Sequence, residues 1–179
     1  MSGEKIIRSP ALSVAVPDGN FVNTVFKDSE KWMMKNAIEC SESGVTYTYS
    51  ELLDQIKKWS GFLKSLNLDH HDSVTIVSSN CLQYVPIFFG TISSGTPVIL
   101  LNPHLSPNEM RRLILNIESK FIVFSREFED SILLALKEDI SKYKLFCIGN
   151  PLKLKAQNVD DILYGKEFMK IFTPSSGYR

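Results

Sequence analysis

Several features that mark particular protein classes are scarce or absent in this chain. Lys plus Arg (20) equals Asp plus Glu (20), so the formal net charge is zero and no charge excess favours nucleic acid as a partner. The most apolar window, residues 86–101, is shorter than the ~20 residues that a membrane-spanning helix needs, and it contains Gly95 and Pro97. A nucleic-acid-binding protein and a membrane-spanning protein are therefore both disfavoured.

Cysteine is also sparse. Cys40, Cys81 and Cys147 lie far apart, and they form no Cys-x-x-Cys pair and no His/Cys group with metal-ligand spacing. This usage favours a reducing compartment over secretion, and the apolar neighbours predict small buried side chains. Met1–Ser9 carries charges without a following apolar block, so no signal peptide is expected.

The best-known catalytic and nucleotide-binding motifs are missing. The chain has no Gly-x-Gly-x-x-Gly, no Gly-x-x-x-x-Gly-Lys-Ser/Thr, no Gly-x-Ser-x-Gly and no His-Glu-x-x-His. Glycine-rich phosphate loops, the nucleophile elbow of hydrolases and the zinc-protease helix are thereby excluded. We assign no catalytic, cofactor-binding or metal-binding residue to this chain from its sequence.

The clearest positive feature is an alternation of short apolar runs with helix-length segments. One helix is expected after Asn80, ending at Gly95, and another after Ser106. Strands that are apolar throughout and alternate with helices are typical of a parallel sheet covered on both faces. The sequence therefore predicts an α/β, parallel-sheet layered fold. Its expected parallel strands are Val74–Val77, Pro97–Leu101, Phe121–Phe124 and Lys144–Ile148.

A long helix is expected before the first of these strands. Ser50 is predicted to cap it, and Asn67 to end it in a left-handed conformation. Large apolar residues recur at spacings of three and four and so share one face. Those residues are Leu52, Ile56, Trp59, Leu63 and Leu66, and the lysines expected to face water are Lys57, Lys58 and Lys64.

Two of the later helices carry strong local signals. Ser106 and Glu109 form a capping-box pattern, with Pro107 at the first helical position. Pro86 lies inside the apolar segment after Asn80, so a kink is predicted there because one backbone donor is missing. A further helix is expected over Glu127–Asp139.

The chain divides by composition into three parts: residues 1–20 as a flexible N-terminal arm, residues 21–150 as an α/β region, and residues 151–179 as a loop with a short helix. We find no internal repeat beyond the strand–helix alternation. The smaller elements expected in these parts are a helix at Phe21–Met33, a hairpin of Asn36–Cys40 with Val45–Tyr49, a surface loop at Pro151–Asn158 and a helix at Asp160–Phe172.

Histidines offer two weak candidate sites. His70-His71 with Asp72 suggests a metal or acid/base site, but a solvated loop explains the same residues more simply. His104 follows a strand, at the sheet edge where open α/β folds bind ligands, although a structural role is the simpler interpretation.

Two polar clusters are equally ambiguous. Ser78-Ser79-Asn80 offers hydroxyls and a helix N-terminus to an anion, but no glycine lets a phosphate approach, and capping of the helix by Asn80 is the simpler role. Asp160-Asp161 resembles a catalytic carboxylate pair, yet acidic residues are common at a helix start. None of these clusters is assigned a chemical role.

Taken in order, the segments from about Phe21 to Asn150 resemble the beginning of the acyl-adenylate-forming superfamily, which includes acyl-CoA synthetases, coumarate–CoA ligases and beetle luciferases. The entry to the long helix, residues 45–52 (Val-Thr-Tyr-Thr-Tyr-Ser-Glu-Leu), is similar to that family's pattern, and His71 stands where the family commonly has glycine. The other matching segments are Asp72-Ser73-Val74, Ser78-x-Asn80, Gly95-Thr96-Pro97-Val98, Asn102-Pro103, Pro107-x-Glu109 and Phe121–Ser125.

The resemblance implies an intact protein that converts a fatty or aromatic acid, with ATP and Mg²⁺, into an acyl-adenylate and then into an acyl-CoA. Family members bind ATP with a Ser/Thr/Gly-rich loop followed by Pro-Lys-Gly, and a small C-terminal domain supplies a lysine. Residues 174–177 (Pro-Ser-Ser-Gly) match only the start of such a loop. We therefore expect an N-terminal ligase fragment that needs no cofactor itself and is inactive alone.

Two alternatives remain. A non-catalytic scaffold or interaction protein could pair with a full-length ligase through apolar surfaces within Ile87–Leu101 or along the face that carries Leu52. A free-standing, flavodoxin-like small-ligand domain is the other. The chain ends in Gly-Tyr-Arg and not in a Ser-Lys-Leu-type address, so a cytoplasmic location is expected, with the peroxisome possible for an intact relative.

Overall fold

The computed structural model describes residues 19–69 and 71–165, and it confirms the predicted α/β class. Its centre is a five-stranded sheet in the order β4-β3-β5-β6-β7. Every neighbouring pair in that sheet runs parallel. The strands are β3 (Val74–Val77), β4 (Val98–Leu101), β5 (Phe121–Ser125), β6 (Lys144–Ile148) and β7 (Gln157–Asn158).

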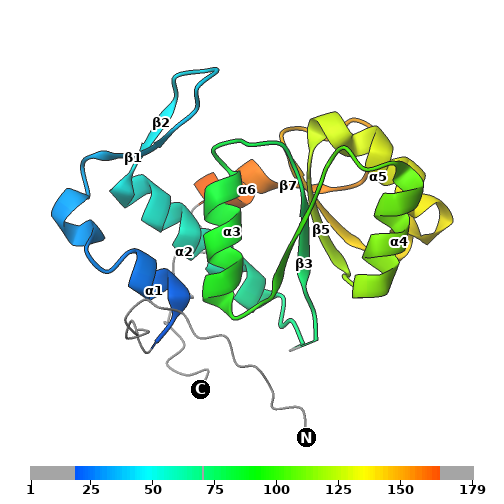
Figure 1. The fold of residues 1–179 in the computed structure, drawn as a ribbon, viewed down its shortest axis with the longest axis horizontal. Coiled ribbons are helices and arrows are strands. Elements are labelled where there is room, and N and C mark those ends of the chain that lie inside the picture. Colours follow the sequence, from blue (N-terminus) through cyan, green and yellow to red (C-terminus); the bar gives the residue numbers. More distant parts are fainter. Residues whose placement is uncertain (1–18, 70, 166–179) are drawn as a thin grey trace, which may run out of the picture.

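Helices cover both faces of this sheet (Figure 1). The helices α2, α3 and α6 pack on one face, and α4 and α5 pack on the other. The α-helices are α1 (Phe21–Val25), α2 (Tyr49–Ser65), α3 (Tyr84–Ser94), α4 (Pro107–Ile117), α5 (Glu129–Leu136) and α6 (Val159–Tyr164). Short 3₁₀ turns occupy Ser29–Trp32, Arg126–Phe128 and Lys137–Lys142.

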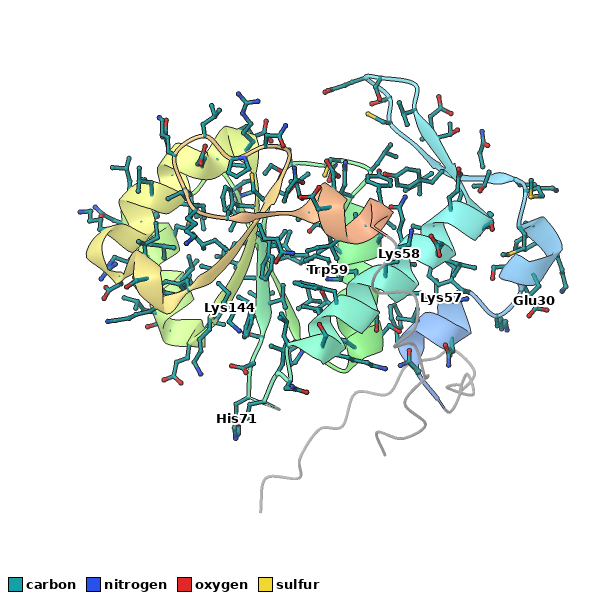
Figure 2. The ribbon with its side chains drawn as sticks, turned by 180° about the vertical axis from the view of Figure 1, so that it is seen from behind. Glu30, Lys57, Lys58, Trp59, His71 and Lys144 are labelled. Carbon is teal, nitrogen blue, oxygen red and sulfur yellow. The ribbon has the colours of Figure 1, made fainter. Side chains whose placement is uncertain are left out.

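The alternation of side chains along each central strand creates two cores. On the α2 side, Trp59 is fully buried and contacts the Phe62 and Phe146 rings. Figure 2 shows its side chain between α2 and the sheet. On the α4 side, Met110 and Ile132 are fully buried against the other face of the same strands. Two separate cores explain why all residues of β3 and β5 are buried.

The predicted hairpin is confirmed as β1 (Asn36–Glu39) paired antiparallel with β2 (Thr46–Thr48). It packs beside the N-terminal end of α2, together with α1, around a third cluster that contains Val22 and Tyr47. The expected helix over Phe21–Met33 is instead two pieces, α1 and the following 3₁₀ turn, because the helix ends at Val25.

The two capping predictions for α2 and α4 have different outcomes. At α4 the Ser106 hydroxyl accepts from the Glu109 N–H, and Pro107 opens the helix as predicted. At α2 the cap is Thr48, whose hydroxyl accepts from the Glu51 N–H, so the assignment of Ser50 is wrong by two residues. The capping-box geometry decides this, since Glu51 is the residue that reaches back to the cap.

The start of α3 also differs from the prediction. The chain after Asn80 forms a turn, and the helix begins only at Tyr84, so Asn80 does not cap it. Pro86 consequently lies in the first helical turn, where its missing N–H has no intrahelical partner to lose. The predicted kink therefore has no cause. The predicted stop at Gly95 is confirmed by its positive φ of 87°, as is the left-handed Asn67.

The remaining differences concern single residues and the C-terminal elements. Lys58, expected in water, is buried and pairs with Asp54 at 2.8 Å. The expected loop before α6 contains the short strand β7 and the buried Leu154. The helix expected over Asp160–Phe172 begins at Val159 and ends at Tyr164, and the rest of that range lies outside the described residues.

The apolar segment of α3 and β4 is not long enough to cross a membrane. Among residues 19–69 and 71–165, no helix has the length and hydropathy of a bilayer span. The apolar character of α3 is instead explained by its position, because Ile87 is fully buried against the sheet and Phe89 contacts Phe21 and Phe26 of the α1 region.

Candidate functional site

The topology singles out one place on the sheet. The chain leaves β3 for β4 on one side and then crosses over β3 to β5 on the other, so the connections after β3 and β5 diverge. Open α/β sheets bind ligands beside such a switch point, outside the carboxyl ends of the strands. Ser78 follows β3 there, and Ser125 ends β5. The carboxyl ends of β3 and β5, around Ser78 and Ser125, are the candidate functional site.

The two serines contact each other directly. Their hydroxyl oxygens lie 2.5 Å apart, and both side chains are buried. The Ser78 hydroxyl donates to the Ser79 carbonyl oxygen at 2.7 Å, so the hydrogen between the two serines comes from Ser125. The Cys81 sulfur lies 3.7 Å from the Ser78 oxygen. The two hydroxyls thus satisfy each other's hydrogen bonding.

A cavity of about 420 Å³ opens between the loop that follows β3 and the end of the β1–β2 hairpin. Its walls combine apolar side chains, a carboxamide, two thiols and two carboxylates, drawn from segments some forty residues apart in the chain. The lining residues are Ile38, Glu39, Cys40, Ser41, Glu42, Asn80, Cys81, Leu82 and Val85.

The two thiols of this cavity differ in acidity. Hydrogen bonds from Ser43 lower the pKa of Cys40, whereas burial raises the pKa of Cys81. Burial also raises the pKa of Cys147, to about 11, inside the sheet. The prediction of buried cysteines is therefore confirmed for Cys147 alone, because Cys40 and Cys81 are only half-buried. Of the two cavity thiols, Cys40 is therefore the more acidic.

The residues of this site are not suited to binding a nucleoside triphosphate. The loop from Ser78 to Gln83 contains no glycine to bring its N–H groups against a phosphate, and Gln83 makes no side-chain cap at the start of α3. The exposed carboxylates of Glu39 and Glu42 would repel polyphosphate. The described stretches also contain no cluster of three or more His, Cys, Asp or Glu residues suited to a metal ion.

His71 and His104 are not among the residues that line this cavity. His104 follows β4, where its ring packs edge-to-face on Phe128 at 5.5 Å, which is a structural contact. His70 falls outside the described residues. His71 is exposed in the turn before β3, where its N–H donates to Asp69 at 3.3 Å. Asp72 accepts from the Asp69 N–H at 2.9 Å within the same turn, and it also pairs with Lys120 at 3.5 Å.

Of the two aspartates at the start of α6, Asp160 has structural contacts. Asp160 accepts from the Gln83 amide at 3.1 Å, and its N–H donates to Asn158, which caps the helix. Asp161 is exposed. The bond to Gln83 ties α6 to the entry of α3, next to the candidate site.

Sequence reasoning missed one buried carboxylate. Glu129 is only 4% exposed and accepts backbone N–H bonds from Leu152, Lys153 and Leu154 at 2.7–3.0 Å. Burial alone would raise the pKa of Glu129, but these three donors and the nearby Lys153 outweigh it, and the pKa is lowered. No local pattern reveals this role, because the three donors lie more than twenty residues away.

A comparison with models of protein families shows to which family the chain belongs. The family model for the AMP-binding enzyme matches residues 25–162, which is most of the chain. The chain belongs to the AMP-binding enzyme family. The resemblance inferred from the ordered segments between Phe21 and Asn150 is thereby confirmed.

Curated relatives within the AMP-binding family are acyl-CoA ligases. A 2-succinylbenzoate–CoA ligase of Oceanobacillus iheyensis is 30% identical over 108 residues, which cover 60% of this chain and 22% of that protein. A 4-hydroxybutyrate–CoA ligase 2 of Metallosphaera sedula is 30% identical over 105 residues, or 59% of this chain and 19% of that protein. The chain thus spans about a fifth of the length of these relatives.

Solved structures of the AMP-binding family share the fold. The luciferase-like enzyme from the nonluminescent mealworm Zophobas morio superposes with a TM-score of 0.82 and 18% identity, covering 98% of this chain and 42% of that one. A benzoate CoA ligase from Burkholderia xenovorans superposes with a TM-score of 0.71 and 18% identity, covering 82% and 28%.

Proposed function

We propose that this chain is the N-terminal scaffold of an acyl-CoA-synthetase-like adenylating ligase. The intact protein would join a fatty or aromatic acid to AMP, with ATP and Mg²⁺, and then transfer the acyl group to coenzyme A. The observation that carries the proposal is the family match over residues 25–162 within a chain that spans about a fifth of its relatives. Residues 21–150 would form the scaffold region, between an arm at 1–20 and a final segment at 151–179.

The chain by itself is proposed to be inactive and to need no cofactor. Support comes from the candidate site. Its glycine-free loop at Ser78–Gln83 and the carboxylates of Glu39 and Glu42 disfavour binding of a nucleoside triphosphate. Since no sequence motif for nucleotide binding accompanies them, we assign no catalytic residue to this chain.

A pyrophosphate exchange assay tests both parts of this proposal. The chain is incubated with ATP, Mg²⁺, labelled pyrophosphate and a panel of fatty and aromatic acids, next to a full-length CoA ligase as the positive control. We expect label in ATP only in the control. Exchange by the chain alone would refute its inactivity. The same assay on a longer product of the same gene tests the ligase assignment, which fails if no acid supports exchange.

A second candidate is a non-catalytic protein that pairs with a full-length ligase. Apolar side chains that remain exposed favour it, namely Leu100 on β4 with Phe21 and Val25 on α1. The Leu52 face, the other surface proposed for such pairing, is buried. Co-purification from native extract tests this candidate, which fails if no ligase of the family is recovered with the chain.

We further propose a cytoplasmic location. The three cysteines are free thiols, as expected for a reducing compartment. Fractionation of cells that express a tagged chain tests the location, and recovery of the chain with peroxisomes would refute it.

A further inference from the structure

The edge strands of the described sheet are β4 and β7, and they differ in how well they resist pairing with an additional strand. The β7 edge is two polar residues long, Gln157 and Asn158. The β4 edge is Val98–Leu101, four consecutive aliphatic residues without a charge or a proline, and its pairing with β3 has no bulge. Short polar edges discourage added strands, whereas a regular apolar edge invites them. The β4 edge is therefore open to a further strand.

The hydrogen-bonding groups on this edge can be identified from the register. Val74 pairs with Val98, and its N–H donates to the Pro97 carbonyl oxygen at 3.0 Å. In a parallel pair this geometry turns the backbone groups of Ile99 toward β3 and those of Val98 and Leu100 outward. The Leu100 side chain is also 50% exposed. Two N–H groups and two carbonyls thus face away from the sheet.

We propose that the β4 edge binds a second copy of this chain, strand to strand and antiparallel. With Ile99 on the two-fold axis, Val98 of each copy lies opposite Leu100 of the other. All four outward N–H groups then meet outward carbonyls, because directly opposed residues in such a pair exchange both bonds. No charged side chain of β4 opposes its own copy. The interface is self-complementary, as a two-fold dimer requires, and it joins two five-stranded sheets.

Light scattering after size-exclusion chromatography tests the association. We expect the wild-type chain to run at twice its 20.3 kDa mass and Leu100→Lys to run as a monomer, because a lysine on an edge strand blocks pairing. Leu134→Lys is the matched control, since Leu134 is similarly exposed (55%) but lies on α5. That variant should remain a dimer. Circular dichroism verifies that both variants fold.

A cysteine at the proposed axis tests the register. Opposed residues in a non-hydrogen-bonded antiparallel pair have Cα atoms about 4.5 Å apart, within the range of a disulfide. Ile99→Cys should therefore cross-link to its own copy under mild oxidation, and peptide mapping should find residue 99 joined to residue 99. Val98→Cys, the neighbouring control, lies opposite residue 100 and should form no such link.

Each other outcome overturns the proposal. A wild-type chain that is monomeric at every concentration refutes it. A monomer whose Val98 and Leu100 amides are protected from hydrogen exchange assigns the edge to a segment of the same chain. A dimer that survives Leu100→Lys places the interface elsewhere. A monomer that pairs only with a full-length ligase gives the edge to a different partner.

Discussion

The two faces of the central sheet are held by different means. On the α2–α3 side, Trp59 fills the space between helix and sheet, and α3 approaches α2 closely at Gly90. On the α4–α5 side, the apolar core is supplemented by directed polar bonds from Arg111 and Glu129. The first face depends mainly on close packing, with the Trp59–Thr91 and Gln83–Asp160 hydrogen bonds in addition, whereas the second also depends on the charges of Arg111 and Glu129. The two faces should therefore respond to different perturbations.

The largest effect is expected on the face that depends on shape. Trp59→Ala removes a fully buried ring and leaves the Thr91 hydroxyl, which accepts from the indole N–H at 2.9 Å, without that donor. We expect a loss of about 3–5 kcal/mol in the free energy of unfolding, measured by urea titration with circular dichroism. Trp32→Ala is the control because Trp32 is 41% exposed, and an equal loss in both variants would contradict the assignment.

A change at the helix crossing should have the next largest effect. A Cβ on Gly90 would lie 2.9 Å from the Ile56 carbonyl oxygen and 2.9 Å from Cδ1 of Trp59. Gly90→Ala should therefore cost about 1–3 kcal/mol, although alanine normally favours a helix. The same titration on Ser93→Ala, a half-buried position in the same helix, provides the reference. A stabilised Gly90→Ala variant would show that α2 and α3 separate freely.

On the other face, Glu129→Gln tests the buried carboxylate. The Gln side chain keeps one acceptor but loses the charge that binds three N–H groups, so we expect a loss of about 1–3 kcal/mol at neutral pH. Because the folded-state pKa of Glu129 is lowered, its stabilisation is complete above the unfolded pKa of about 4.3 and falls as the pH drops through the folded value.

The measurement is urea unfolding of wild type and variant across acidic pH. The stability difference should shrink as the pH falls, and a constant difference would rule out the charge as its cause. Glu127→Gln is the matched control, since Glu127 is exposed and close by in the chain. Its stability should equal that of wild type.

The smallest effect is expected at Arg111. Its guanidinium donates to the carbonyl oxygens of Ala135 and Leu136 at 3.1 and 3.2 Å and pairs with Asp139, which joins α4 to the end of α5. Arg111→Met keeps the apolar stem and should cost about 1 kcal/mol. The exposed neighbour Arg112→Met should be neutral in the same titration. Identical stabilities of the two variants would mean that these bonds add nothing.

The elements that the sequence predicted correctly depend on near neighbours in the chain. The capping box at Ser106 and Glu109, the left-handed stop at Gly95 and the apolar runs of the central strands are all decided within a few residues. The sequence alone cannot distinguish the true N-cap of a helix from a nearby residue when several residues of N-cap type lie close together. Thr48 was therefore missed in favour of Ser50, and Asn80 was wrongly assigned as the cap of α3.

The candidate site was predicted less completely than the fold. Ser78 and Asn80 were recognised as polar groups after a strand, but Ser125, which bonds to Ser78, and the hairpin wall with Cys40 were not associated with them. These groups meet only because β3 and β5 are neighbours in space and the β1–β2 hairpin packs beside them. No local pattern contains that information.

The sequence by itself determined the α/β class, most strand and helix positions and the family, because apolar periodicity, caps and turn residues act over short distances along the chain. Only the tertiary structure decided which strands became neighbours, which edge of the described sheet stayed unpaired and where Glu129 and Arg111 found partners. The physical reason is that burial and hydrogen bonding depend on distance in space, and chain crossovers bring together groups that are remote in the sequence.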